Sequence, residues 1–246
     1  MTQLRSAALT DIGRVRRRNE DRMVLNEKLA LFGVADGVGG LPGGAEAAEL
    51  ALLKVTEAIS LVDKAKITPG EPLDMVTIVQ NASNAVFELG RKISPNSGIA
   101  STLTVATIIG RQMVLGHVGD SRCYTQRGDS FSALTTDHSV ENEIRLRRAQ
   151  GEDVYFHESN RHALTRCIGQ PGAIEVDVIR RTLQARDRYL FCTDGVTGLV
   201  SDAELSAFLT RDEDPEPVLR EIISLAIRRG GHDNATGVLL YIDSVA

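Results

Sequence analysis

The stretch LFGVADGVGG at residues 31–40 joins an apolar run to Asp36 and then to a glycine-rich loop. Directly after the loop, residues 45–60 (AEAAELALLKVTEAIS) repeat apolar side chains at spacings of three and four. A short apolar run beside glycine is typical of a buried strand, and the three-and-four spacing is typical of a helix with one buried face. The stretch therefore predicts a strand over 29–35 and a helix over 45–60, with an acidic side chain where the strand ends.

Three further segments place an aspartate at one end of an apolar run. They are VLGHVGDSRC at 114–123, YLFCTDGVTG at 189–198 and GGHDNATGVLL at 230–240. If these strands lie side by side, Asp36, Asp120, Asp194 and Asp233 gather at one rim of a sheet. Carboxylates about 4 Å apart repel by roughly 4 kcal/mol per pair at an effective dielectric of about 20, so the cluster requires a cation. Because oxygen ligands favour Mg²⁺ and Mn²⁺, the pattern predicts a metal-dependent enzyme.

The rest of the chain predicts further blocks of strands and helices. Strands are expected over 3–9, 22–27, 101–109, 112–118, 121–127, 130–134, 174–180, 188–193 and 235–242, and helices over 73–92, 139–150, 202–209 and 215–229. The short loops within 101–134 imply antiparallel hairpins. Such sheets, with long helices to cover them, predict an α+β fold: a four-layer α-β-β-α sandwich of two mostly antiparallel sheets flanked by helices. Residues 1–246 contain no internal repeat and are expected to form one domain.

Composition and charge argue against several function classes. With 42% hydrophobic and 25% charged residues, the chain has the composition of an ordinary soluble protein. A net charge of −5 argues against nucleic acid as a partner. The sequence lacks an apolar run long enough to span a membrane and the apolar stretch of a signal peptide. The cysteines Cys123, Cys167 and Cys192 form no CxxC pair, which suggests a reducing compartment. We therefore expect a cytoplasmic domain that binds neither nucleic acid nor membrane.

Taken singly, the motifs allow ordinary structural explanations. Asp36-Gly37 and Asp194-Gly195 could be hairpin turns, since Asp-Gly is a favoured pair there. The glycine-rich loop 37–44 could cradle a phosphate at the helix N-terminus. However, Pro42 replaces the last glycine of GxGxxG and Ala45 replaces the lysine of a P-loop, which argues against both kinds of nucleotide site.

Five segments in a fixed order carry a resemblance to a known family. They are GRVRRRNED at 13–21, VADGVGG at 34–40, VGDSR at 118–122, CTDG at 192–195 and GHDNAT at 231–236. Together they resemble the PP2C-type (PPM) protein phosphatases, the metal-dependent Ser/Thr phosphatases, in their bacterial branch. The match covers nearly the whole chain in the family's order and spacing, which argues against chance similarity.

The resemblance implies a metal centre built on three catalytic aspartates. Asp36 would bridge two Mn²⁺ or Mg²⁺ ions, and the backbone carbonyl of Gly37 would bind the second ion. Asp194 and Asp233 would complete the coordination of the first ion. The expected cofactors are therefore two or three Mn²⁺ or Mg²⁺ ions.

The resemblance also implies roles for four residues around that centre. Glu20 and Asp21 would hold metal-bound waters, and Asp120, together with Asp194, would bind a third ion. Arg16, five residues before Asp21, would grip the substrate phosphate, for which a planar guanidinium is well suited.

The expected reaction is hydrolysis of phosphoserine or phosphothreonine in proteins. A two-metal site lowers the pKa of a bridging water, so that hydroxide is available near pH 7 for in-line attack on phosphorus. Arg16 and the metals would offset charge on the phosphoryl oxygens. The implied partners are proteins phosphorylated by Ser/Thr kinases, or a kinase itself, and the chain is expected to act as a monomer.

Two positions depart from the family pattern. Val38 stands where some members carry a histidine proposed as general acid. His138 and His232 are the remaining candidates near the motifs, although a hydrogen-bonded structural role is favoured for both. Residues 40–45 (GLPGGA) replace the usual glycine-rich loop, which bears on substrate preference.

Residues 137–168 correspond to the flap beside the active site in the bacterial family. Arg145, Arg147, Arg148 and Arg161 of this segment could meet acidic or phosphorylated partners, and a solvated helix face explains the first three equally well. Two other functions stay open. One is a non-catalytic domain that binds phosphoproteins, against which the complete ligand set argues, and the other is a metal-dependent phosphodiesterase.

Overall fold

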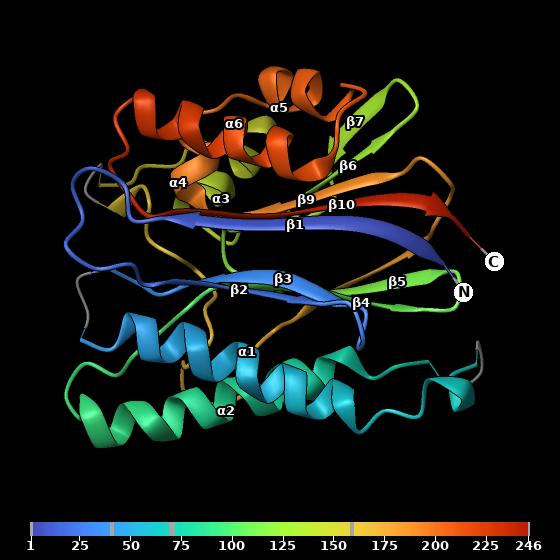
Figure 1. Ribbon diagram of the computed structural model, residues 1–246. Coiled ribbons are helices and arrows are strands. Elements are labelled where there is room, and N and C mark those ends of the chain that lie inside the picture. The colour runs from blue at the N-terminus through green and yellow to red at the C-terminus, as the bar shows by residue number, and fades with distance from the viewer. Residues whose placement is uncertain (1, 40–41, 69–71, 158–159, 246) are drawn as a thin grey trace.

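The fold is a sandwich of four layers (Figure 1). The computed structural model describes residues 2–39, 42–68, 72–157 and 160–245. Two five-stranded antiparallel sheets face each other in the middle, and helices cover the outer side of each sheet. The predicted α+β class and the α-β-β-α sandwich are confirmed.

Each sheet draws its strands from distant parts of the chain. The first sheet has the order β2-β3-β4-β5-β8, with β2 Asp21–Asn26, β3 Leu31–Asp36, β4 Leu103–Ile109, β5 Gln112–Val118 and β8 Asp177–Thr182. The second has the order β1-β10-β9-β6-β7, with β1 Gln3–Asp11, β10 Ala235–Ser244, β9 Arg188–Cys192, β6 Arg122–Arg127 and β7 Ser130–Ala133. Helices α1 Gly44–Ser60 and α2 Met75–Ile93 cover the first sheet, and α5 Asp202–Leu209 and α6 Pro215–Arg228 cover the second (Figure 1). The remaining helical segments of the described residues are α3 Val140–Ala149, α4 Asp194–Thr197 and η1 Lys64–Lys66.

The central strands are buried on both faces, which explains their continuous apolar sequence. In β3, Leu31 and Ala35 pack in the cluster under α1 and α2, whereas Phe32 and Val34 pack in the cluster between the two sheets. Strand side chains alternate between faces, so each face of β3 buries apolar side chains. Full burial of a large aliphatic or aromatic side chain contributes about 1.5–3 kcal/mol.

The loop between β3 and α1 requires glycine. A Cβ on Gly37 would lie 2.3 Å from the backbone of Gly44, and Gly43 has a φ of +89°. Glycine alone tolerates both the close approach and the left-handed backbone at no steric cost. The end of β3, with Asp36, therefore abuts the first turn of α1.

One prediction about the aspartates is wrong in a specific way. Asp36 ends β3 in the first sheet, whereas Asp194 and Asp233 lie next to β9 and β10 in the second. Asp120 lies between β5 and β6, where the chain passes from one sheet to the other. The four residues therefore share one end of the sandwich, not one rim of a single sheet. Apolar runs buried on both faces give no sign of which sheet a strand will join.

The hairpin explanation fails for both Asp-Gly pairs. Gly37 follows β3 and forms an isolated antiparallel bridge with Ser101. Asp194 begins α4, a short helix that the sequence did not predict. Other boundaries shift by a few residues, as in β8, which was expected over 174–180.

The cysteines and the helices agree with the expectations from composition. All three cysteines are free, and Cys123 and Cys192 are buried. Burial raises the pKa of both thiols, which keeps them protonated. Among the described residues, no helix has the length and apolar character needed to cross a bilayer.

Candidate active site

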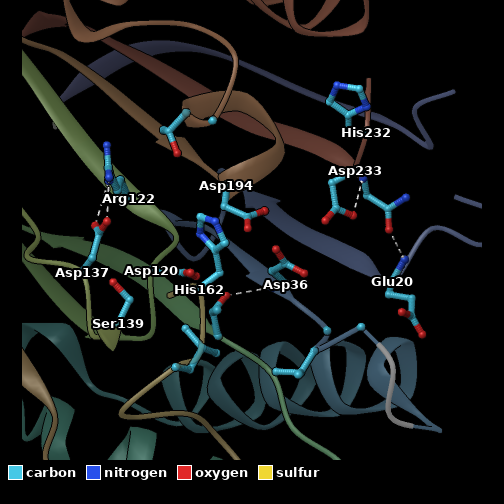
Figure 2. A pocket seen from close by; sticks show the side chains of 18 of the residues that line it. Glu20, Asp36, Asp120, Arg122, Asp137, Ser139, His162, Asp194, His232 and Asp233 are labelled. Atoms are coloured by element: carbon cyan, nitrogen blue, oxygen red, sulfur yellow. Dashed lines mark hydrogen bonds and ion pairs between the residues drawn. The ribbon is translucent and has the colours of Figure 1, made fainter. Parts of the chain in front are cut away.

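A cavity of about 730 Å³ lies at the end of the sandwich where the two sheets bring their acidic residues together (Figure 2). Of the predicted site residues, all but one line this cavity: Arg16, Glu20, Asp36, Gly37, Asp120, Asp194 and Asp233. The exception, Asp21, is 3% exposed and lies beneath the others. We refer to Asp21, Asp36, Asp120, Asp194 and Asp233 as the carboxylate cluster.

The pairing of β2 with β3 places Asp21 directly opposite Asp36. Thr102, the residue just before β4, fixes the backbone of Asp36. The N–H of Asp36 donates to Thr102 Oγ1 (2.9 Å), and its carbonyl accepts from Thr102 N (2.8 Å). Ser101 Oγ donates to the same carbonyl at 2.9 Å. These bonds hold Asp36 on a rigid part of the first sheet, at the position from which its side chain reaches the cavity.

Thr193 joins the cluster across the two sheets. Its Oγ1 donates to Asp21 Oδ2 at 2.9 Å and accepts from the N–H of Thr236 at 3.1 Å. The next residue, Asp194, opens α4 against the second sheet. Gly195 permits this close packing, because a Cβ there would lie 2.0 Å from the carbonyl oxygen of Asn234. A carboxylate of the first sheet is thus tied to the strand end that carries Asp194.

Asn234 fixes the arginine-rich loop against Asp233. Its Oδ1 accepts from the N–H of Glu20 (2.8 Å), and its Nδ2 donates to the carbonyls of Ile12 (2.9 Å) and Arg18 (3.0 Å). The three bonds use both ends of one side-chain amide. Loop 12–20 is therefore held along the cavity, with Arg16 and Glu20 on its wall.

Arg16 lines the cavity beside Asp233. Its Nη2 donates to Asp233 Oδ2 at 2.7 Å, and both side chains remain partly exposed. A Cβ on Gly39 would lie 2.6 Å from Nη1 of Arg16, so the guanidinium occupies the space that a side chain at Gly39 would need. Glycine at this position therefore lets the loop after β3 lie against the guanidinium.

Burial, and then repulsion between neighbouring carboxylates, raises the pKa of four residues of the cluster: Asp21, Asp36, Asp120 and Asp194. Burial raises the pKa of Asp21 to about 6 and that of Asp120 to about 7, and Asp194 adds to both shifts. The pKa of Asp36 rises well above its usual value, first through burial and then through Asp21, Asp194 and Asp120. Each shift means that ionisation of the carboxyl is disfavoured unless positive charge is supplied.

The cluster fits divalent cations by its donor chemistry. Oδ1 of Asp21 and Oδ1 of Asp194 are buried, and among the described residues neither oxygen accepts a hydrogen bond. Such oxygens are costly to bury unless they bind a partner, and carboxylate sets are typical of Mg²⁺ and Mn²⁺ sites. Within the part of the chain that the structure describes, no three His, Cys, Asp or Glu side chains converge tightly enough to hold an ion as they stand. Repulsion between ionised carboxylates opposes such convergence.

Another wall of the cavity comes from the segment that the resemblance predicts to be the flap, for which we keep that name. Ser139, Glu141, His162 and Leu164 line it, and we call these four residues the flap wall. The segment that carries His162 pairs with the start of α3, because Val140 N donates to the Ala163 carbonyl (2.9 Å) and Glu141 N donates to the Arg161 carbonyl (3.0 Å). Glu141 in turn accepts from Arg161 Nε at 2.8 Å.

The two histidines considered from the sequence differ in role. His138 is 2% exposed, accepts from the N–H of Gly119 through Nδ1 (3.1 Å) and pairs with Asp177 through Nε2 (3.2 Å). Its expected structural role is confirmed. His232 is instead exposed and lines the cavity.

Three of the flap arginines bond to side chains of the flap itself. Arg161 binds Glu141, Arg147 binds Glu152 (2.8 Å), and Arg145 donates to Asn142 (2.7 Å).

Comparison with known proteins identifies the family. Residues 15–223 match the family model of protein phosphatase 2C. The chain belongs to the protein phosphatase 2C family. It is 30% identical over 237 residues to the serine/threonine phosphatase stp of Listeria innocua, across 94% of this chain and 93% of that protein.

Solved protein phosphatase 2C structures share the fold over almost the whole chain. The S. agalactiae serine/threonine phosphatase superposes with a TM-score of 0.84 at 28% identity, covering 98% of this chain and 100% of that one. The catalytic domain of the serine/threonine phosphatase PstP, solved in complex with two manganese ions, superposes with a TM-score of 0.82 at 27% identity, covering 98% and 99%. The predicted family, its bacterial branch and the enzyme class, a serine/threonine protein phosphatase, are confirmed.

Several residues of the site were not singled out from the sequence. Thr193 and Asn234 stand inside the motifs CTDG and GHDNAT, so their motifs could have drawn attention to them. Thr102 follows the SPNSG turn region and carries no such signal. The same holds for His162, in a stretch with weak periodicity, because its place in the cavity depends on pairing with α3.

Proposed function

We propose that the chain hydrolyses phosphoserine and phosphothreonine monoesters in proteins at the carboxylate cluster. The observation that supports this most directly is a cavity in which buried carboxylates with raised pKa values stand beside Arg16. Clustered acids with shifted pKa values in a cavity are typical of functional sites. Divalent cations would be attracted by the acids, and a phosphate dianion by the cations and the guanidinium.

The cluster divides the ligand roles as follows. Asp36, Asp194 and Asp233 would hold the first Mn²⁺ or Mg²⁺, and Asp36 with the carbonyl of Gly37 would hold the second. Asp21 and Glu20 would orient waters around the ions, and Asp120 with Asp194 would bind a third. When bound, the ions would supply an activated water and offset charge on the phosphoryl oxygens.

Arg16 would bind and orient the phosphate. Its pair with Asp233 is partly exposed on both sides, with 40% and 33% of the side chains accessible. Ion pairs of this kind are worth about 0–1 kcal/mol, so the guanidinium can leave Asp233 for a substrate at little cost. A guanidinium presents parallel N–H groups to two phosphoryl oxygens, which fixes the phosphorus over the cluster.

Broader features of the function rest on the sequence alone. We take residues 1–246 as one phosphatase domain with residues 137–168 as its flap. A monomeric state, a cytoplasmic location and a role opposing Ser/Thr kinases, with a kinase among the substrates, stay predictions.

Substrate and metal panels test the proposal. The purified chain should release phosphate from p-nitrophenyl phosphate and from phosphoserine peptides with Mn²⁺ or Mg²⁺, and should lose this activity in EDTA. Asp194→Asn should lose activity by about 1,000-fold, since it removes a carboxylate at the centre of the cluster. Near wild-type turnover in Asp194→Asn would overturn the proposal. Preferential cleavage of bis-p-nitrophenyl phosphate would identify a phosphodiesterase, and phosphopeptide binding without release would identify a binding domain.

A further inference from the structure

The leaving serine or threonine oxygen needs a proton donor, and neither Val38 nor the carboxylate cluster provides one. When the phosphorus–oxygen bond of a phosphoserine breaks, the electron pair stays on the serine oxygen, and a strongly basic alkoxide must take a proton. Val38 has no proton to give. The carboxylate cluster, once it binds cations, is ionised and can only accept hydrogen bonds.

Histidine is the usual general acid, and two of the histidines are excluded as the proton donor by their burial and bonding. His117 and His138 are buried, and both ring nitrogens of each are already bonded, to Thr104 and Thr136 in His117 and to Gly119 and Asp177 in His138. Two histidines, His162 and His232, line the cavity among the described residues. His232 precedes Asp233 and lies on the same side of the cavity as Glu20 in Figure 2, whereas His162 belongs to the flap wall.

We propose that His162 is the general acid that protonates the leaving serine or threonine oxygen. This inference rests on the proposed phosphatase function and assigns a residue to its leaving-group step. Figure 2 shows the imidazole of His162 in the cavity, on the side away from Glu20 and Asp233. Arg16 is paired with Asp233 on that opposite side. A phosphate held by Arg16 would then have its leaving oxygen directed toward the flap.

The backbone holds His162 in a defined place despite its exposed side chain. Ala163 N donates to the Asn160 carbonyl at 3.0 Å, which closes a turn with Arg161 and His162 at its centre. The carbonyls on either side of His162, at Arg161 and Ala163, accept from the first N–H groups of α3. The turn is therefore anchored to a helix N-terminus on both sides of the imidazole.

The carboxylate of Glu141 lies beside the ring of His162. Its Oε2 lies 3.9 Å from His162 Nδ1, too far for a hydrogen bond but within ion-pair distance of a protonated ring. The bond from Arg161 lowers the pKa of Glu141, so this carboxylate stays ionised. With Nδ1 beside Glu141, Nε2 is the nitrogen left to face the cavity.

The step balances without any further reactant. The oxygen of water forms the new bond to phosphorus, and the bond from phosphorus to the side-chain oxygen breaks with its electron pair on that oxygen. The proton on Nε2 passes to the same oxygen and gives a neutral serine or threonine. A proton lost by the attacking water, exchanged through solvent, restores the imidazolium.

Leaving-group dependence distinguishes this role from a structural one. p-Nitrophenolate is a stable anion and needs no acid, whereas a serine alkoxide does. His162→Gln should therefore keep kcat on p-nitrophenyl phosphate near the wild-type value and lose about 100-fold in kcat on a phosphoserine peptide. Across substituted phenyl phosphates, its rate should depend more steeply on leaving-group basicity than that of the wild type.

A matched variant and a binding measurement complete the test. His157→Gln changes another flap histidine that does not line the described cavity, and should leave both substrates unaffected. On an Asp36→Asn background, His162→Gln should leave the phosphopeptide Kd unchanged within about two-fold, because a proton donor acts in the transition state.

Other outcomes overturn the inference. Equal loss on both substrates, full activity on the peptide, or a loss confined to KM or Kd would each exclude His162 as the acid. A selective loss in His232→Gln instead would assign the step to that residue. If wild-type protein cleaves no monoester at all, the proposed function fails, and that result is separate from any effect of His162→Gln.

Discussion

The carboxylate cluster and the flap wall face each other across one cavity but are built differently. The cluster stands on strand ends of two sheets and is tied by buried bonds such as Thr193 Oγ1 to Asp21 and Thr102 to Asp36. The flap wall stands on a turn and the first residues of α3, and Glu141 and His162 are partly or fully open to solvent. The difference suggests that phosphate chemistry is fixed by the sandwich, while contacts to the rest of the substrate depend on the flap.

The largest expected effect comes from neutralising the centre of the cluster. Asp36→Asn should reduce Mn²⁺-dependent turnover by about 1,000-fold or more, on a small aryl phosphate and a phosphopeptide alike, because charge stabilisation at phosphorus is lost for both. The same variant should be more stable than the wild type without metal, since the pKa of Asp36 is raised by burial and by its acidic neighbours. Thermal unfolding in EDTA measures this. A variant that is both inactive and less stable would mean that Asp36 has a structural role.

Arg16 stands beside the cluster, paired with Asp233, and its removal should have the next largest effect. Arg16→Ala should lower kcat/KM by about 100-fold through loss of a charge-assisted phosphate contact. Gly39→Ala should act on the same residue from the other side, with a loss of about 10-fold, because the new Cβ would meet Nη1 at 2.6 Å. The variant that combines Arg16→Ala with Gly39→Ala should have the same kcat/KM as Arg16→Ala alone, because the contact that Gly39→Ala disturbs is already lost. Arg17→Ala, on the exposed neighbour, is the control, and additive losses in the double variant would contradict the shared mechanism.

The sequence predicted the carboxylate cluster better than the flap wall, and the way each region is built explains the difference. The cluster was predictable by residue because each aspartate adjoins an apolar strand, and strand ends are fixed by the hydrophobic pattern. That Asp36 and Asp194 come from different sheets was not predictable, because strands buried on both faces read alike in either sheet. The place of His162 in the cavity was not predictable. Two backbone hydrogen bonds to α3 bring it there, and such bonds leave no pattern in the sequence, whereas a strand does.

Titration of the cluster carboxyls should change the free energy of unfolding, and this effect is smaller than the losses of activity predicted for Asp36→Asn and Arg16→Ala. Burial raises the pKa of Asp120 to about 7, and burial together with acidic neighbours raises the pKa of Asp36 well above its usual value. The folded state therefore holds protons that the unfolded state has released. These groups stabilise the metal-free fold at low pH, and the contribution is lost as pH rises through their folded pKa values. Between about pH 6.5 and pH 8, where unfolded histidines are mostly neutral, the unfolding free energy should fall by on the order of 1 kcal/mol.

Denaturant unfolding in EDTA across that pH range is the measurement. Asp120→Asn should flatten the slope, and Mn²⁺ should reduce it, because a bound cation favours the ionised carboxylates. Below this range the buried His117, whose pKa burial lowers to about 4, acts in the opposite direction. A free energy of unfolding that rises from pH 6.5 to pH 8 would contradict the raised pKa values of Asp36 and Asp120.

The smallest effect should come from the flap wall itself, at Glu141. Glu141→Gln removes the charge beside His162 and the partner of Arg161, but leaves a side chain of the same shape on a partly exposed surface. Because exposed ion pairs are worth about 0–1 kcal/mol, kcat on a phosphoserine peptide should fall by only about three-fold, with no change on p-nitrophenyl phosphate. Glu143→Gln, two residues along α3 and outside the cavity lining, should change neither. A large loss on both substrates would show that Glu141 supports the cluster across the cavity. The cluster and the flap wall would then act as one site, and phosphate chemistry would depend on both.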